Sequence, residues 1–123
     1  MARILVVDDD PDITFAVSLY LKREKHEVST AASRAEAMDA LKTHPADLII
    51  LDVMMEQPDD GIAMAQELRR SGSTVPIIML TSVGQVTGMS YGRDSDLVPV
   101  EAFFEKPVRP DALLKAVNGL LKP

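Results

Sequence analysis

Five residues with charged or reactive side chains lie one or two positions after the short apolar segments of this chain. They are Asp8, Asp9, Asp52, Thr81 and Lys106. Carboxylates at one place could hold a hard divalent cation, and a lysine beside them could bind a phosphate. A carboxylate can also act as a nucleophile and become an aspartyl-phosphate. This chemistry requires a fold that brings all five residues together.

The apolar run before Asp52 gives the clearest structural signal. Leu48-Ile49-Ile50-Leu51 has no polar alternation, which is typical of a strand buried on both faces of a parallel sheet. In open α/β sheets, ligands bind beyond the carboxyl ends of the strands. Asp52 is therefore predicted at the binding edge, where a buried carboxylate needs compensating charge or hydrogen bonds.

The remaining segments alternate between strand and helix patterns. The predicted strands are residues 3–7, 27–31, 48–51, 77–80 and about 102–105. The predicted helices run from Pro11 to about Lys25, from the Ser33 cap to near His44, through Ile62 to Ser71, and from Pro110 to Leu121. Because short connections between parallel strands require right-handed crossovers, this order predicts an α/β fold with a doubly wound, five-stranded parallel sheet.

The segment from Val83 to Val100 departs from this pattern. Gly84, Gly88 and Gly92 recur every four residues where the fourth helix of the alternation is expected. Each glycine in a helix interior costs about 1 kcal/mol relative to alanine. The prediction is an atypical fourth helix that is short, displaced or mobile.

Three of the acids are expected to repel one another. If Asp8, Asp9 and Asp52 meet at one edge, two unit charges about 4 Å apart repel by roughly 4 kcal/mol at an effective dielectric of 20. Mg²⁺, usually held by few carboxylates and several waters, would relieve this repulsion. Phosphoryl transfer needs mainly positioning and charge neutralisation, so with Thr81 and Lys106 the set predicts phosphorylation of Asp52.

Each piece also has an ordinary explanation. Residues 8–10 could serve simply as a cap for the helix that starts at Pro11. Thr81 and Ser82 could be turn residues, and Lys106 could be an ordinary surface residue. Asp52 is hardest to explain this way because it ends a buried strand. The five residues, each at the end of the appropriate strand, favour a single site.

Composition narrows the function further. The chain of 123 residues is 46% hydrophobic and 26% charged, has a net charge of −6 and contains no cysteine. These values predict one domain (residues 1–123), with no membrane segment, in a reducing cytoplasm. The acidic balance argues against direct nucleic-acid binding, which rests largely on phosphate neutralisation.

The chain resembles the receiver domains of two-component response regulators over its whole length. The matching motifs are Val7-Asp8-Asp9-Asp10, Leu51-Asp52 with Met55 three residues on, Leu80-Thr81-Ser82, and Phe104-Glu105-Lys106-Pro107. The resemblance implies a flavodoxin-like sheet with strand order 2-1-3-4-5. It also implies that a histidine kinase or phosphotransfer protein supplies the phosphoryl group to Asp52.

The resemblance further implies a role for each site residue. Mg²⁺ would be held by Asp9 directly, by Asp8 largely through water, by Asp52 and by the backbone carbonyl of Met54. Thr81 and Lys106 would bind the phosphoryl oxygens, and Thr81 and Phe103 would be the switch residues. The region 83–110 would bind a downstream protein. Such a protein is not a conventional enzyme, although it catalyses its own aspartate phosphorylation and dephosphorylation.

Three other functions remain to be weighed. A haloacid-dehalogenase-like phosphatase needs a second aspartate two residues after the nucleophile, where this chain has Met54. A flavin carrier of the flavodoxin type needs a hydroxyl and glycine loop after the first strand, where this chain has acids. A receiver used only as a non-phosphorylated docking module is the remaining alternative, although all the acceptor residues are present.

Overall fold

The structure of the protein is a computed structural model, in which residues 2–52, 60–82, 102–106 and 109–121 are described. Strands and helices alternate along the described residues as far as β4. In chain order the elements are β1 (Arg3–Val7), α1 (Pro11–Arg23), β2 (Glu27–Ala31), α2 (Arg34–Thr43), β3 (Leu48–Asp52), α3 (Asp60–Arg70), β4 (Ile77–Ser82), β5 (Ala102–Lys106) and α4 (Pro110–Leu121). The predicted atypical helix within 83–100 lies outside the described residues.

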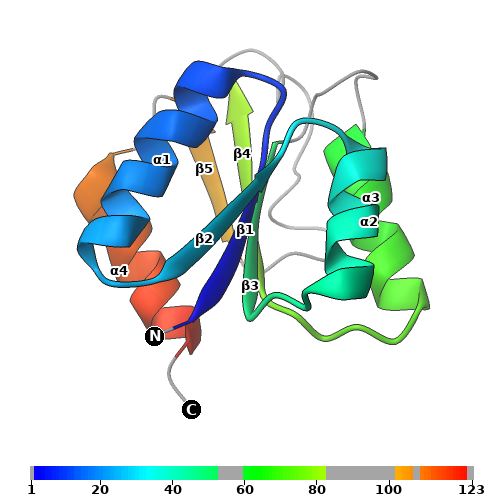
Figure 1. Ribbon diagram of the computed structural model, residues 1–123. Helices are drawn as coiled ribbons and strands as arrows, with labels where there is room; N and C mark the ends of the chain where they lie inside the picture. The colour runs from blue at the N-terminus through cyan, green and yellow to red at the C-terminus, as the bar shows by residue number, and fades with distance from the viewer. Residues whose placement is uncertain (1, 53–59, 83–101, 107–108, 122–123) are drawn as a thin grey trace.

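All the described strands belong to one parallel sheet with the order β2-β1-β3-β4-β5. The register aligns Val7 of β1 with Ala31 of β2 and with Leu51 of β3. Figure 1 shows α1 and α4 on one face of the sheet and α2 and α3 on the other. The predicted α/β class, with a parallel sheet between helical layers, is confirmed.

Two apolar clusters form because successive side chains of a strand point to opposite faces. One face carries Leu5, Ile49 and Met79 against α2 and α3. The other carries Val6, Ile50 and Leu80 against α1 and α4. All five residues of β3 are buried, so the uniformly apolar run 48–51 is explained by packing on both faces of the central strand.

The ends of two helices follow the predicted capping rules. Asp10 Oδ1 accepts a hydrogen bond from Asp12 N at 2.9 Å, and proline occupies the next position. Ser33 Oγ accepts from Glu36 N at 3.1 Å. These bonds satisfy backbone donors that a helix N-terminus leaves without partners. The predicted starts at residues 10–11 and 33 are confirmed.

Two strand ends differ from the prediction by one or two residues. The strand predicted over 77–80 continues to Ser82, and the strand predicted to about 105 continues to Lys106. Thr81 pairs with Glu105, and Ser82 pairs with Lys106. The apolar pattern stops where the side chains become polar, whereas the backbone pairing continues beyond it.

The turn between α3 and β4 is held by one side chain and one glycine. Arg69 Nη1 donates to the carbonyl of Ser73 at 3.2 Å and to that of Val75 at 2.8 Å. Gly72 has φ +95°, and Ser73 N donates to the carbonyl of Leu68. A left-handed residue after the last helical turn is the usual end of an α-helix.

None of the helices in the described ranges combines the length and apolar character needed to cross a membrane.

Substitution by alanine should have opposite effects on stability at Gly72 and Gly119, the two glycines whose surroundings are described. A Cβ atom added to either Gly72 or Gly119 meets nothing within 4 Å. Gly119→Ala, inside α4, should stabilise the protein by about 1 kcal/mol because alanine is the better helix former. Gly72→Ala should destabilise it by about 1 kcal/mol because the φ of +95° disfavours a side chain.

Urea unfolding of both variants and the parent, followed by circular dichroism, measures the two differences. Each variant is the control for the other, since both gain one methyl group in open space. Shifts of the same sign in both midpoints would contradict the backbone argument.

Candidate phosphoryl and metal site

Three aspartates meet at the carboxyl edge of the sheet, at the top of Figure 1. Asp8 directly follows β1, and Asp52 is the last residue of β3. Because Val7 and Leu51 are partners in the register, the next residues, Asp8 and Asp52, lie side by side. Asp9 follows Asp8 in the turn that leads into α1.

The three carboxylates converge on one point. A carboxylate oxygen from each of Asp8, Asp9 and Asp52 lies within 4.8 Å of the other two. Asp8 is 2% exposed and Asp52 is 3% exposed, whereas Asp9 is exposed to solvent. Two acids therefore form the floor of the site, and the third lies on its open side.

The third acid of the Asp8-Asp9-Asp10 run has a different task. Asp10 Oδ1 is occupied by the backbone N–H of Asp12 as the cap of α1. Its own N–H donates to Asp8 Oδ1 at 2.9 Å. Sequence reasoning left capping and metal binding open for the whole run. The structure divides the run, with Asp10 as the cap and Asp8 and Asp9 turned toward Asp52.

The hydrogen bond from Asp10 N also orients Asp8. The backbone N–H of Asp8 donates to the carbonyl of Ala31 on β2 at 3.1 Å. Asp8 is thus held through its backbone by one neighbouring strand and through a carboxylate oxygen by the turn into α1. The residue pattern alone did not indicate the bond from Asp10 N to the Asp8 carboxylate.

Thr81 and Lys106 lie on the same edge of the sheet by their backbone positions. Asp52 pairs with Leu80 on β4, so Thr81 lies one residue beyond the partner of Asp52. Thr81 in turn pairs with Glu105, and Lys106 is the next residue of β5. The ends of β1, β3, β4 and β5 therefore line up. The side chains of Thr81 and Lys106 lie outside the part of the chain that is described.

The other predicted site residues cannot be placed in the same way. Phe103 of β5 pairs with Met79 of β4. The side chain of Phe103 lies outside the described atoms. Met54 and most of the partner region 83–110 fall within the ranges 53–59, 83–101 and 107–108, which are also outside. Their roles stay predictions.

The donor set fits a small hard cation. Three carboxylates supply oxygen ligands, which Mg²⁺ prefers to nitrogen or sulfur, and Mg²⁺ commonly keeps several waters beside one or two carboxylates. Two buried like charges are costly without a counter-charge, because unit charges 4 Å apart repel by about 4 kcal/mol at an effective dielectric of 20. Asp8, Asp9 and Asp52 could therefore hold Mg²⁺.

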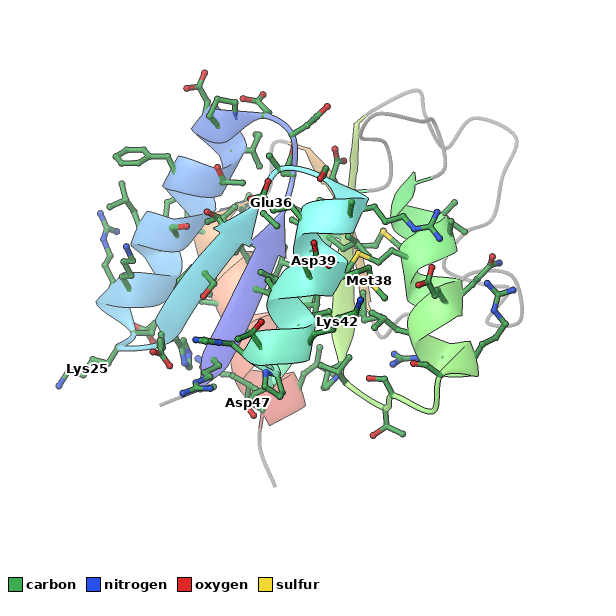
Figure 2. The ribbon with its side chains drawn as sticks, turned by 45° about the vertical axis from the view of Figure 1, so that its right-hand side comes forward. Lys25, Glu36, Met38, Asp39, Lys42 and Asp47 are labelled. Carbon is green, nitrogen blue, oxygen red and sulfur yellow. The ribbon has the colours of Figure 1, made fainter. Side chains whose placement is uncertain are left out.

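A separate cavity lies at the opposite, amino-terminal edge of the sheet. It has a volume of about 690 Å³ and is lined by Ala2, Arg3, Lys25, His26, Glu27, Pro45 and Asp47. Figure 2 labels Lys25 and Asp47 at this lower edge. Its charges are mixed in sign, and Arg3 is already paired with Glu27 at 2.8 Å. The chemistry described above belongs to the acidic edge.

The sequence matches the family model of the response regulator receiver domain over residues 4–118. Among curated relatives, the chain is 37% identical to the probable transcriptional regulator ycf27 of Cyanidium caldarium. It is 34% identical to the DNA-binding dual master transcriptional regulator RpaA of Synechocystis sp.. These two alignments cover 98% and 99% of this chain but only 50% of each relative. The chain thus spans about half the length of these relatives.

A solved structure gives the same family likeness. The chemotaxis protein CheY4 of Vibrio cholerae superimposes with a TM-score of 0.83 at 31% sequence identity. The alignment covers 98% of this chain and 99% of that protein. The sheet with its two helical layers is therefore an arrangement shared with chemotaxis receivers.

Asp9 and Asp10 allow a matched test of metal binding. Asp9→Asn removes a charged ligand and should weaken Mg²⁺ binding by about tenfold or more, since each 1.4 kcal/mol is a tenfold change. Asp10→Asn removes the same charge one residue away but keeps a good helix cap. Its Mg²⁺ affinity should stay within about threefold of the parent. Titration calorimetry with MgCl₂ measures both, and equal losses would show general charge attraction rather than ligation by Asp9.

Proposed function

This chain belongs to the family of response regulator receiver domains, and from that premise we propose that it accepts a phosphoryl group on Asp52 in a Mg²⁺-dependent reaction. The observation that carries the proposal is the convergence of Asp8, Asp9 and Asp52, with oxygens within 4.8 Å of one another at the end of the buried strand β3. The donor would be the phosphohistidine of a histidine kinase or phosphotransfer protein.

In the proposed reaction, a carboxylate oxygen of Asp52 attacks the phosphorus atom in line with the leaving group. The bond between phosphorus and the imidazole nitrogen breaks, and that nitrogen keeps the electron pair. The product is an acyl phosphate on Asp52 and a free histidine on the donor. Water later attacks the same phosphorus atom, the bond between phosphorus and the Asp52 oxygen breaks, and inorganic phosphate and the free carboxylate are released; in this proposal the chain catalyses that dephosphorylation as well.

Asp8 and Asp9 act by charge and position. Together with Asp52 and the backbone carbonyl of Met54 they would hold Mg²⁺, which neutralises the phosphoryl oxygens and the surrounding carboxylates. Asp8 is fixed by its bond from Asp10 N and buried beside Asp52, so it needs no reorganisation when the phosphoryl group arrives. Asp9, on the exposed side, is the acid that an incoming hydrated cation reaches first.

Thr81 and Lys106 would bind the oxygens of the transferred group. Their backbones lie on β4 and β5, the strands that continue the sheet from β3. A lysine ammonium group is a mobile point charge suited to phosphate, and a threonine hydroxyl can donate a hydrogen bond to it. Thr81 and Phe103 would transmit the change to the partner surface in the region 83–110.

The partners of the whole protein follow from the same premise. The name of RpaA describes that protein as DNA-binding, and this chain spans half the length of RpaA. For residues 1–123 we propose a single receiver domain whose net charge of −6 disfavours direct contact with nucleic acid. Any DNA binding by a longer protein would then reside outside these residues.

Asp52 and Asp47 provide a matched test at the two ends of β3. Asp52→Asn should abolish Mg²⁺-dependent phosphorylation by acetyl phosphate, because the amide is no nucleophile for phosphorus. Asp47→Asn should leave phosphorylation within about twofold of the parent, because its oxygen still accepts the bond from Arg3 N and a surface charge change of this kind has small effects. Intact-protein mass spectrometry counts the phosphoryl groups.

Two results would contradict the proposal. Full labelling of the Asp52→Asn variant would place the acceptor elsewhere. No labelling of the parent, and no beryllofluoride binding with Mg²⁺, would favour the alternative function of a non-phosphorylated docking module.

A further inference from the structure

The outward face of α1 carries two exposed apolar side chains. Phe15 is 66% exposed and Leu19 is 45% exposed, and they are the large exposed hydrophobic residues of the described chain. On the opposite side of the same helix, Val17 is 1% exposed and Leu21 is fully buried. Because residues four apart are neighbours on a helix surface, Phe15 and Leu19 form one continuous apolar patch.

Charges of opposite sign flank this patch. Asp12 lies in the first turn of α1, and Lys22 and Arg23 lie in the last turn. All three are exposed, and none forms a salt bridge with a residue in the described ranges. We define the outer stripe of α1 as Asp12, Phe15, Leu19 and Lys22.

The stripe has the spacing of a coiled-coil seam. Its members are separated by three, four and three residues, which is the alternation of the inward positions of a heptad. A helix normally buries such a seam against a partner. Figure 1 shows α1 and α4 side by side in one helical layer, and α1 contacts the described elements β1, β2 and α4.

The order of the stripe is complementary to itself when reversed. Phe15 and Leu19 are equidistant from Val17, and so are Asp12 and Lys22. An antiparallel copy of the helix, related by a twofold axis near Val17, would place Phe15 opposite Leu19 and Asp12 opposite Lys22. A parallel copy would instead oppose Asp12 to Asp12. Twofold axes generate the self-complementary interfaces that are commonest in homo-oligomers.

We propose that the outer stripe of α1 is a self-association surface on which a second copy of this chain packs its own α1 in antiparallel orientation. The occupant is argued from the charge complementarity and from the symmetric spacing of the stripe. Two apolar side chains from each copy make a contact well below the roughly 1,600 Å² of a standard interface. The dimer is therefore weak and forms at high protein concentration.

Sedimentation velocity of the parent chain over a wide concentration range, without phosphodonor or Mg²⁺, tests the association. The sedimentation coefficient should rise with concentration toward that of a dimer. A Phe15→Ser, Leu19→Ser double variant should remain monomeric throughout. A parent that stays monomeric at the highest soluble concentration, or a double variant that dimerises equally, would overturn the proposal.

A charge exchange tests the antiparallel orientation. Asp12→Lys alone and Lys22→Asp alone should each weaken the dimer by about tenfold, because twofold symmetry places each like-charge contact in the interface twice. The double variant with both changes should recover association to within about threefold of the parent. Failure of the double variant to recover would overturn the antiparallel arrangement.

Asp39→Lys is the matched control for the charge change. Asp39 lies on α2, on the other face of the sheet, and its side chain is 81% exposed (Figure 2). This variant should dimerise like the parent. Thermal unfolding of every variant identifies any loss of folding. This check is needed because Asp12→Lys in the first turn of α1 and Lys22→Asp in its last turn both oppose the helix dipole.

The association is independent of the proposed phosphorylation. The Asp52→Asn variant should dimerise like the parent, so failure of either idea leaves the other standing. If the parent is monomeric and the double serine variant loses only phosphotransfer from a histidine kinase, the stripe serves that donor and the self-association proposal is wrong.

Discussion

The repulsion among three carboxylates at one edge of the sheet is the interaction on which the structure depends. Asp8 and Asp52 are buried, and their carboxylate oxygens lie within 4.8 Å of each other, an arrangement that is costly unless neighbouring groups or a cation compensate the two charges. The fully buried strand β3 and the apolar clusters on both its faces must offset that cost. A cation at this edge would relieve that repulsion.

Much of the fold could be predicted because the burial of a segment determines its pattern of apolar and polar residues. The unalternated run 48–51 marks a strand covered on both faces, and Asp10 and Ser33 mark helix starts by side chains that accept backbone N–H bonds. The ends of β4 and β5 were less predictable. Thr81, Ser82 and Lys106 continue the backbone pairing after the apolar pattern has ended, since hydrogen-bonded register does not depend on side-chain polarity.

The division of labour within Asp8-Asp9-Asp10 could not be read from composition. Three identical side chains offer the same capping and ligating groups, and only the path of the turn after β1 decides which faces Asp52 and which faces the helix. The bond from Asp10 N to Asp8 Oδ1 records that path. The exposed pair Phe15 and Leu19 could in principle be predicted from the sequence, because helical spacing places both residues on the side opposite Val17 and Leu21, which are buried.

The same turn links the acidic edge to the outer stripe of α1. Asp10 caps α1 with its side chain and fixes Asp8 with its backbone N–H, so the position of α1 and the orientation of a buried site carboxylate share one residue. Any shift of α1 on self-association that altered this bond would change the free energy of a cation at Asp8. Linkage is reciprocal, and a cation at the site would then change the dimerisation constant by the same factor. The cap that Asp10 forms on α1 holds the helix and the turn in one position, so this coupling is small and the association stays independent of phosphorylation.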